Sequence, residues 1–145
     1  MRLKDAIRPP VTQKHPAGCA VACVAYTLNR SYDASLRLFD RSNQAIDRGF
    51  LCSEIVLALE RGGRTFSFCK KTKCDASYKQ PGVIVFIARS QKYPIGHFLV
   101  RTEDGSWMNS WINFPCIVPA ASGFQSKLPG TAQWIIYPIC THSHS

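Results

Sequence analysis

The chain has 145 residues, of which 46% are hydrophobic and 19% are charged. This composition supports one compact domain with a sizeable core and excludes intrinsically disordered and highly charged classes of protein. Lys and Arg number 18 against 9 Asp and Glu, so the net charge is +9. Such a surplus favours an acidic partner, an anionic surface or nucleic acid. We expect a single domain over residues 1–145.

The basic residues are scattered along the chain, and their densest run is Lys70-Lys71-Thr72-Lys73, with Lys79 soon after. That run has no glycine-rich phosphate cradle and no recognition-helix pattern. We interpret it as a solvated basic loop and regard a nucleic-acid site as the less favoured alternative. An acidic protein partner stays open.

The N-terminal residues 1–5 have no apolar signal core, and no stretch approaches the roughly 18 to 20 apolar residues of a membrane span. We therefore expect a soluble cytoplasmic protein without a membrane segment. The chain has 7 cysteines, an odd number, so at least one is unpaired in a monomer. A reducing compartment is expected, in which the cysteines are mostly thiols.

Helices are predicted in the first half of the chain. Three prolines before residue 17 disfavour helix, so residues 1–12 are expected to form an extended arm. Residues 19–28 are apolar nearly all round and rich in Ala, which predicts a buried central helix. Asp33 can cap a short helix over 34–39, and Ser53 opens a third helix that stops at two glycines, 62 and 63.

Beyond residue 63 the pattern changes to runs rich in β-branched and aromatic residues, which predict strands. The candidate strands are 65–69, 83–88, 97–102, 107–112 and 133–137. Residues 103–106 read as a tight turn between the third and fourth strands. Helices followed by antiparallel strands predict an α+β fold with N-terminal helices packed on the sheet. Residues 141–145 are expected to form a flexible tail.

Cys19 begins the central helix, where free backbone N–H groups stabilise a thiolate. Gly18, just ahead of it, permits close backbone approach. Six positions upstream, Gln13 carries a side-chain amide that can reach back around the loop. That amide and the N–H of Cys19 would make two donors for a tetrahedral oxyanion. Cys23, further along the same apolar run, is expected to be a core residue.

The base must come from the 4 histidines of the chain. His142 and His144 lie in the tail, and His15 lies in the loop before the central helix, where we expect it to face solvent. His97 opens an apolar strand, so a rigid element would hold its ring. It is therefore the predicted base.

Asn109 is the predicted orienting residue for His97. The turn at 103–106 brings the two strands together, and an amide oxygen there can fix the tautomer of the imidazole. Trp111 is expected to shield that hydrogen bond from water. Each residue alone also fits a structural role, and their joint occurrence with Gln13 favours catalysis.

Metal binding is not expected. Two pairs of cysteines have short spacings, Cys19 with Cys23 and Cys69 with Cys74. Neither pair is C-x-x-C, and an apolar helix is a poor host for two thiolates. We therefore predict no metal and no cofactor.

Gln13, Cys19, Ala20 and Cys23 resemble the opening motif of the peptidases that cleave double-glycine leaders in bacteriocin export, a branch of the papain-like cysteine peptidases. Further similarity lies in the segments 53–63, 81–86 and 96–100. The likeness spans about residues 13–112 and implies a papain-like fold and a bacterial or phage source. Gly18 stands where the family usually has an acidic residue. The Asn-Ser-Trp that starts at Asn109 is more similar to papain than to the Asp-Pro of leader peptidases.

The resemblance and the residues together predict a freestanding cysteine peptidase that acts on a peptide or protein. Leader peptidases are usually the first domain of an ABC exporter, and neither membrane segment nor ATPase is found in this sequence. The sequence leaves two alternatives open. One is a deamidase or transglutaminase-like enzyme of the same fold, and the other is a non-catalytic basic binding module.

Overall fold

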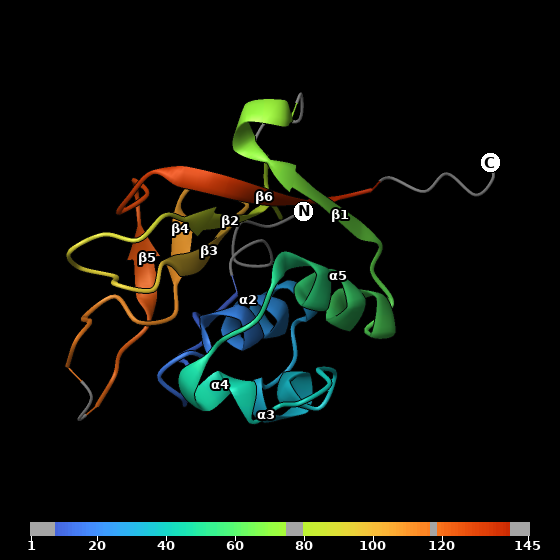
Figure 1. Cartoon of the computed structure of the whole chain (residues 1–145), viewed down its shortest axis with the longest axis horizontal. Coiled ribbons are helices and arrows are strands. Elements are labelled where there is room, and N and C mark those ends of the chain that lie inside the picture. The colour runs from blue at the N-terminus through green and yellow to red at the C-terminus, as the bar shows by residue number, and fades with distance from the viewer. Residues whose placement is uncertain (1–7, 75–79, 117–118, 140–145) are drawn as a thin grey trace.

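The computed structural model describes residues 8–74, 80–116 and 119–139. Helices occupy one side of the molecule and a six-stranded antiparallel sheet the other (Figure 1). The predicted α+β class is therefore confirmed. Residues 8–12 of the expected arm are neither helix nor strand, while residues 1–7 and the expected tail lie outside the described residues.

Most elements lie within two residues of their predicted bounds. The helices are α2 (Cys19–Leu28), α3 (Tyr32–Leu36), α4 (Gln44–Asp47), α5 (Cys52–Arg61) and the 3₁₀ helix η1 (Lys71–Lys73). The strands are β1 (Phe66–Lys70), β2 (Ile84–Ile87), β3 (His97–Arg101), β4 (Trp107–Asn109), β5 (Gly123–Gln125) and β6 (Ala132–Pro138). Their order in the sheet is β1-β6-β2-β3-β4-β5. Every pairing is antiparallel.

Helix α2 is the central helix that the sequence predicts. Its residues from Ala20 to Thr27 are all buried, and the helix packs against β3 and α5. Asn29 ends it in the left-handed conformation, with φ at 56°, a common helix terminator. The buried position of α2 fixes its first residue, Cys19, at the edge of the core.

The starts of the other two predicted helices differ from the prediction. Helix α3 begins two residues early because Ser31, not Asp33, is its cap: the Ala34 N–H donates to Ser31 Oγ at 3.0 Å. Asp33 lies in the first turn instead, where a carboxylate also favours the helix. Helix α5 begins at Cys52, one residue before the predicted Ser53.

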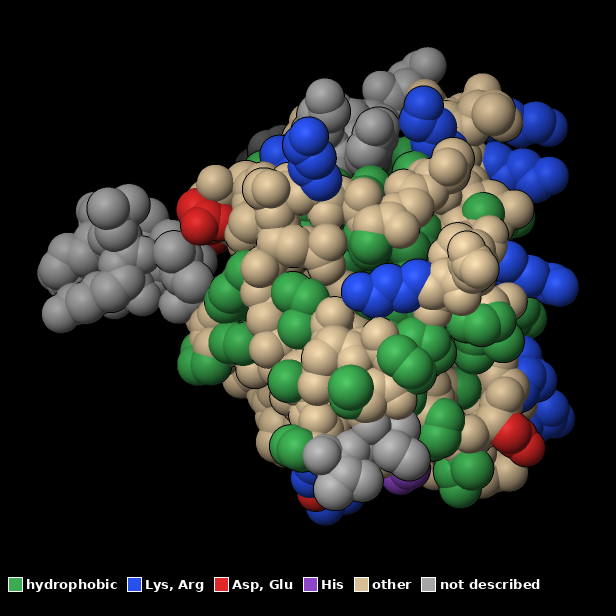
Figure 2. Space-filling view, turned by 90° about the vertical axis from the view of Figure 1, so that its left-hand side faces the viewer, with side chains coloured by type: hydrophobic (Ala, Val, Ile, Leu, Met, Phe, Trp, Pro, Cys, Tyr) green, Lys and Arg blue, Asp and Glu red, His purple; other side chains and the backbone are tan. Residues whose placement is uncertain are grey.

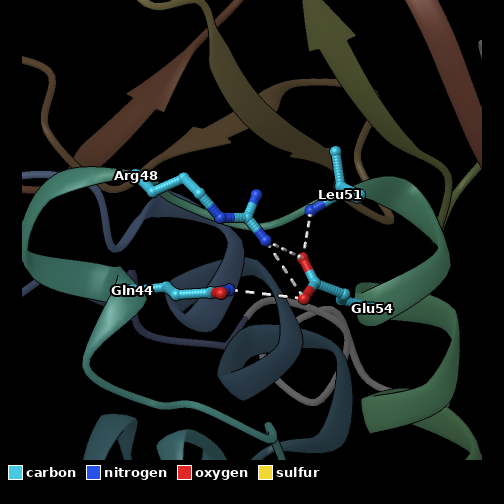
Figure 3. A network of polar contacts seen from close by, with 4 residues as sticks. All are labelled: Gln44, Arg48, Leu51 and Glu54. Atoms are coloured by element: carbon cyan, nitrogen blue, oxygen red, sulfur yellow. Dashed lines mark hydrogen bonds and ion pairs between the residues drawn. The ribbon is translucent and has the colours of Figure 1, made fainter.

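Helix α4 was not predicted, and a polar network joins it to α5 (Figure 3). The Glu54 carboxylate accepts the Leu51 N–H at 2.7 Å, Arg48 Nη2 at 3.3 Å and Gln44 Nε2 at 3.3 Å. The bond to Leu51 satisfies a backbone donor at the start of α5. Helix α4 has only four residues, too few for a periodic pattern in the sequence.

Strand β4 ends at Asn109, earlier than the predicted residue 112. The Asn109 side-chain oxygen accepts the Trp111 N–H at 2.9 Å, so an Asx-type turn replaces the next ladder bond. The predicted turn at 103–106 is confirmed, since the Thr102 N–H donates to Ser106 O at 2.9 Å. Strand β5 and η1 were not predicted, because each has three residues and no alternating pattern.

The two faces of the sheet are covered differently. Alternate residues of a strand point to opposite faces. One face packs on the helices and includes Phe98 and Val100 of β3. The other face includes Leu99 and packs against loop residues such as Tyr93. His97 lies two residues before Leu99 in β3, so its side chain points to the same face, away from the helices.

The described cysteines are mostly thiols, as expected, but one pair is oxidised. Cys69 at the end of β1 and Cys74 after η1 form a disulfide, with their Cα atoms 5.9 Å apart, inside the usual range for such a bond. The free cysteines among the described residues are Cys19, Cys23, Cys52 and Cys116.

Membrane-spanning helices and metal-binding groups are absent from the described residues. They contain no helix that has the length and hydropathy to cross a membrane. In the same ranges, no three His, Cys, Asp or Glu residues come together as a metal-binding group.

Candidate active site

His97 and Asn109 are hydrogen-bonded in the interior of the protein. His97 Nε2 lies 2.8 Å from Asn109 Oδ1, and the two residues are 3% and 0% exposed. In the ladder between β3 and β4, Val100 pairs with Met108, so Asn109 falls opposite Leu99, diagonal to His97. Diagonal neighbours on one face of an antiparallel pair are within reach of long side chains.

A glycine is required immediately before His97. Gly96 has φ at +81°, and a Cβ there would come 2.8 Å from the carbonyl oxygen of Ile87. Only glycine adopts this left-handed conformation without strain. The Gly-His pair therefore sets the position at which β3 begins and the imidazole enters the sheet.

The orientation of the Asn109 amide is fixed by four hydrogen bonds. Its oxygen accepts from His97 and from the Trp111 N–H, and its nitrogen donates to Tyr93 Oη at 3.0 Å and to Gln125 Oε1 at 2.8 Å. Since both amide hydrogens are engaged, the oxygen must face the imidazole. His97 Nε2 is then the protonated nitrogen, and Nδ1 is the one that can accept a proton.

Tyr93 covers the imidazole of His97. The Tyr93 and His97 rings are stacked, with centroids 4.3 Å apart and planes 9° apart. The backbone of Trp111 also takes part, donating its N–H to Asn109 and accepting the Tyr93 hydroxyl at 3.0 Å. Tyr93 and Gln125 were not predicted from the sequence, since one lies in a loop and the other in the unpredicted β5.

Cys19, half-buried at the start of α2, lies beside the first residues of β3. Its thiol lies near the backbone N–H groups of Phe98, the residue that follows His97, and of Ala20, and both groups favour the thiolate. The fold thus brings Cys19 to the strand that carries His97, although 78 positions of sequence separate them.

Burial keeps the Cys19 thiol and the His97 imidazole neutral at pH 7. Burial raises the pKa of the Cys19 thiol to about 11, although the N–H groups of Phe98 and Ala20 oppose the rise. Burial also lowers the pKa of His97 to about 4; the bond to Asn109 opposes this, and the charge of Lys92 adds to it. The resting pair is therefore a thiol and a neutral imidazole, which can act as a base.

Gln13 is buried between the loop before α2 and the turn after β4. Its backbone N–H donates to Ser110 O at 3.3 Å, and its Oε1 accepts the Ser110 hydroxyl at 2.7 Å. Its Nε2 donates to the carbonyl oxygens of His15 at 2.9 Å and Pro16 at 3.2 Å. Gln13 is close to the Cys19 loop, as expected, but both of its amide hydrogens are engaged by that loop.

His15 does not face solvent as predicted. It is half-buried, and its Nδ1 lies 2.9 Å from the Tyr32 hydroxyl. That hydroxyl also occupies the place where a Cβ on Gly18 would lie. His15 and Tyr32 therefore hold the loop that precedes Cys19, and Gly18 is needed because Tyr32 packs against it.

Cys23 is a core residue, as predicted. It is 0% exposed, and burial raises the pKa of its thiol well above the ordinary value. It lies one helical turn beyond Cys19 and packs in the cluster between the helices and the sheet. It therefore offers a matched control for Cys19.

Two cavities open near these residues. An apolar pocket of about 320 Å³ lies between α5 and the sheet, and Phe98 is in its wall together with Phe50, Leu51, Phe86 and Trp134. A smaller cavity of about 180 Å³ is lined by Gln13, His15 and Trp111 among others. Both adjoin residues that contact the candidate catalytic groups.

Comparison with models of protein families finds no match to the chain, and comparison with curated proteins finds none either.

Proposed function

We propose that this protein is a freestanding cysteine peptidase with a papain-like fold, in which Cys19 is the nucleophile and His97 the base. One observation carries the proposal. The Cys19 thiol lies near the backbone N–H of Phe98, the residue that follows His97, whose imidazole is held by Asn109 at 2.8 Å. A nucleophile, a base and an orienting group are the parts of a catalytic triad.

The protonation states define the first step. His97 Nδ1 takes the proton of the Cys19 thiol while the sulfur attacks the carbonyl carbon of the scissile bond. The imidazolium that forms still donates its Nε2 proton to Asn109 Oδ1 in a hydrogen bond, and this bond stabilises the positive charge. His97 then gives the Nδ1 proton to the leaving amine, and the C–N bond breaks to leave an acyl thioester on Cys19. Water, deprotonated by His97, releases the acid and restores the thiol.

The oxyanion of the tetrahedral intermediate needs two donors. The Cys19 N–H is one, because the first backbone N–H groups of a helix have no partner within it. Gln13 Nε2 supplies the second after it releases the carbonyl of Pro16, the longer of its two bonds at 3.2 Å. The bond from Ser110 to Gln13 Oε1 keeps the amide nitrogen on the side of the loop during this change.

The apolar pocket at Phe98 supports a peptide substrate. Its wall is built largely of aromatic and aliphatic side chains, so it suits an apolar side chain of a bound peptide. Because the backbone N–H of Phe98 lies near the Cys19 thiol, such a side chain would lie within a few residues of the bond that is cut.

Mass spectrometry of a peptide library treated with the protein tests the proposal. We expect new termini with the parent protein and none with Cys19→Ala, whereas Cys23→Ala, the control one turn along α2, retains cleavage. A mass gain of about one unit on Gln or Asn without new termini would replace the peptidase by a deamidase. Products that persist in Cys19→Ala would overturn the assignment of the nucleophile.

A further inference from the structure

A second cleft, separate from the candidate active site, lies on the face of the sheet away from the helices. Its volume is about 680 Å³, within the range of cavities that bind ligands. The lining residues come from η1, the end of β3, the start of β4 and the chain from β5 to the start of β6, and they include Lys71, Thr72, Arg101, Trp107, Lys127 and Thr131.

Positive charge and hydroxyl groups dominate the walls of this cleft. Lys71, Arg101 and Lys127 bring three cations from three separate segments, and none of the described lining residues is acidic. Thr72 and Thr131 add hydroxyl donors. Convergence of cations and hydroxyls on one cavity favours an anion with several negative groups.

The fold holds the cationic segments in place. The disulfide between Cys69 and Cys74 closes the short loop that carries η1 and the densest basic run of the sequence. On the opposite wall, Gln125 Nε2 donates to the carbonyl of Lys127 at 2.9 Å. Gln125 also accepts from Asn109, so one hydrogen-bonded chain joins this cleft to the base of the candidate active site.

One face of the molecule carries many basic side chains. Figure 2 shows Lys and Arg side chains gathered over the upper part and along the right-hand edge of the view, with acidic side chains only in small separate patches. At the cleft itself, the charged lining residues are Lys71, Arg101 and Lys127, and the acidic residues Glu103 and Asp104 precede Gly105 in the chain. A surplus of positive charge attracts an oppositely charged ligand.

We infer that this cleft docks an acidic peptide segment, with carboxylates paired to the cations of Lys71, Arg101 and Lys127. Nucleic acid is disfavoured by the aromatic side chain in the wall. Trp107 is 2% exposed, and the Arg101 guanidinium lies over its ring at 5.0 Å, so it offers no face for base stacking. The cleft is also a single hollow, whereas a nucleic-acid strand needs a continuous basic track.

Fluorescence anisotropy with a labelled oligoglutamate peptide tests this docking site. The Cys19→Ala protein is used throughout, so that binding is measured without hydrolysis and is independent of the proposed peptidase activity. We expect salt-dependent binding that Lys127→Gln weakens by about tenfold and that Lys71→Gln/Lys127→Gln weakens further. Arg37→Gln, which removes the same charge from an exposed position at the end of α3, should leave the affinity unchanged.

Three results would overturn the inference. They are absence of peptide binding, equal loss of affinity in the Arg37 and Lys127 variants, and tighter binding of a single-stranded oligonucleotide that competes with the peptide. Thermal unfolding of each variant checks that the fold is intact. Because Lys127 is exposed, its substitution tests the cleft even if the double variant folds poorly.

Discussion

The two halves of the candidate active site differ in how complete they are. On β3 and β4, His97 and Asn109 are buried, and each polar group of the Asn109 side chain has a partner. In the loop before α2, the Gln13 amide donates to carbonyls of its own loop, and at the start of α2 the Cys19 thiol is held neutral by burial. The proposed base is therefore preorganised, whereas the proposed nucleophile and oxyanion donor are in a resting arrangement.

Under the proposed function, this difference assigns the conformational change that catalysis requires to one segment. The network around His97 is locked by Tyr93 and Gln125 and needs no movement to accept a proton. The Gln13 loop must release one hydrogen bond before its amide can face an oxyanion. Substrate binding is the event that can offset this cost, because catalysis uses interactions that strengthen in the transition state.

Removal of the base should have the largest effect. His97→Ala should lower the rate of peptide cleavage by about 10³-fold or more, since the Cys19 thiol then has no group to take its proton. His15→Ala is the matched control, because His15 bonds to Tyr32 and lies outside the triad. Cleavage rates on a peptide selected from the library measure both, and equal losses would reduce His97 to a structural residue.

Gln13→Ala tests the resting half of the site. We expect kcat to fall by about 10²-fold with little change in KM, as for loss of one oxyanion donor. Ser110→Ala removes only the bond to Gln13 Oε1 and should change kcat far less. If both variants lose stability and keep kcat, Gln13 serves only to hold its loop.

Asn109→Ala should weaken the preorganised half, by about 10- to 100-fold in rate. The bond to Asn109 raises the pKa of His97, so its loss lowers that pKa further below about 4. The cleavage rate of the parent protein should rise with pH through about 4, as His97 becomes neutral. In the variant, this rise in rate should occur at lower pH. A rise that moves to higher pH would contradict the electrostatic account.

Tyr93→Phe should have the smallest effect. It removes the hydroxyl that bonds to Asn109 and Trp111 but keeps the ring that stacks on His97. We expect a loss of about 1 kcal/mol in the free energy of unfolding and a change in rate of only a few-fold. Chemical denaturation and cleavage rates measure the two, and Tyr93→Leu, which also removes the stack, should cost more in both.

The sequence predicted the elements that have long patterns and missed those that depend on tertiary contacts. The helix that begins at Cys19 and the strand that follows Gly96 can be predicted from the sequence, because their buried residues follow one another continuously or periodically. The contacts of Tyr93 and Gln125 are not, since they depend on loops and on a three-residue strand. The hydrogen bonds from Gln13 to carbonyls of its own loop likewise depend on the folded conformation of that loop and could not be predicted from the sequence.

The alkylation rate of Cys19, followed by mass spectrometry with iodoacetamide, tests the pairing of Cys19 with His97 most directly and needs no substrate. At pH 7 we predict that Cys19 reacts at least tenfold faster in the parent protein than in His97→Ala, because the imidazole accepts the thiol proton during attack. The exposed Cys116 should react equally in both proteins. Equal rates at Cys19 in the two proteins would contradict the account.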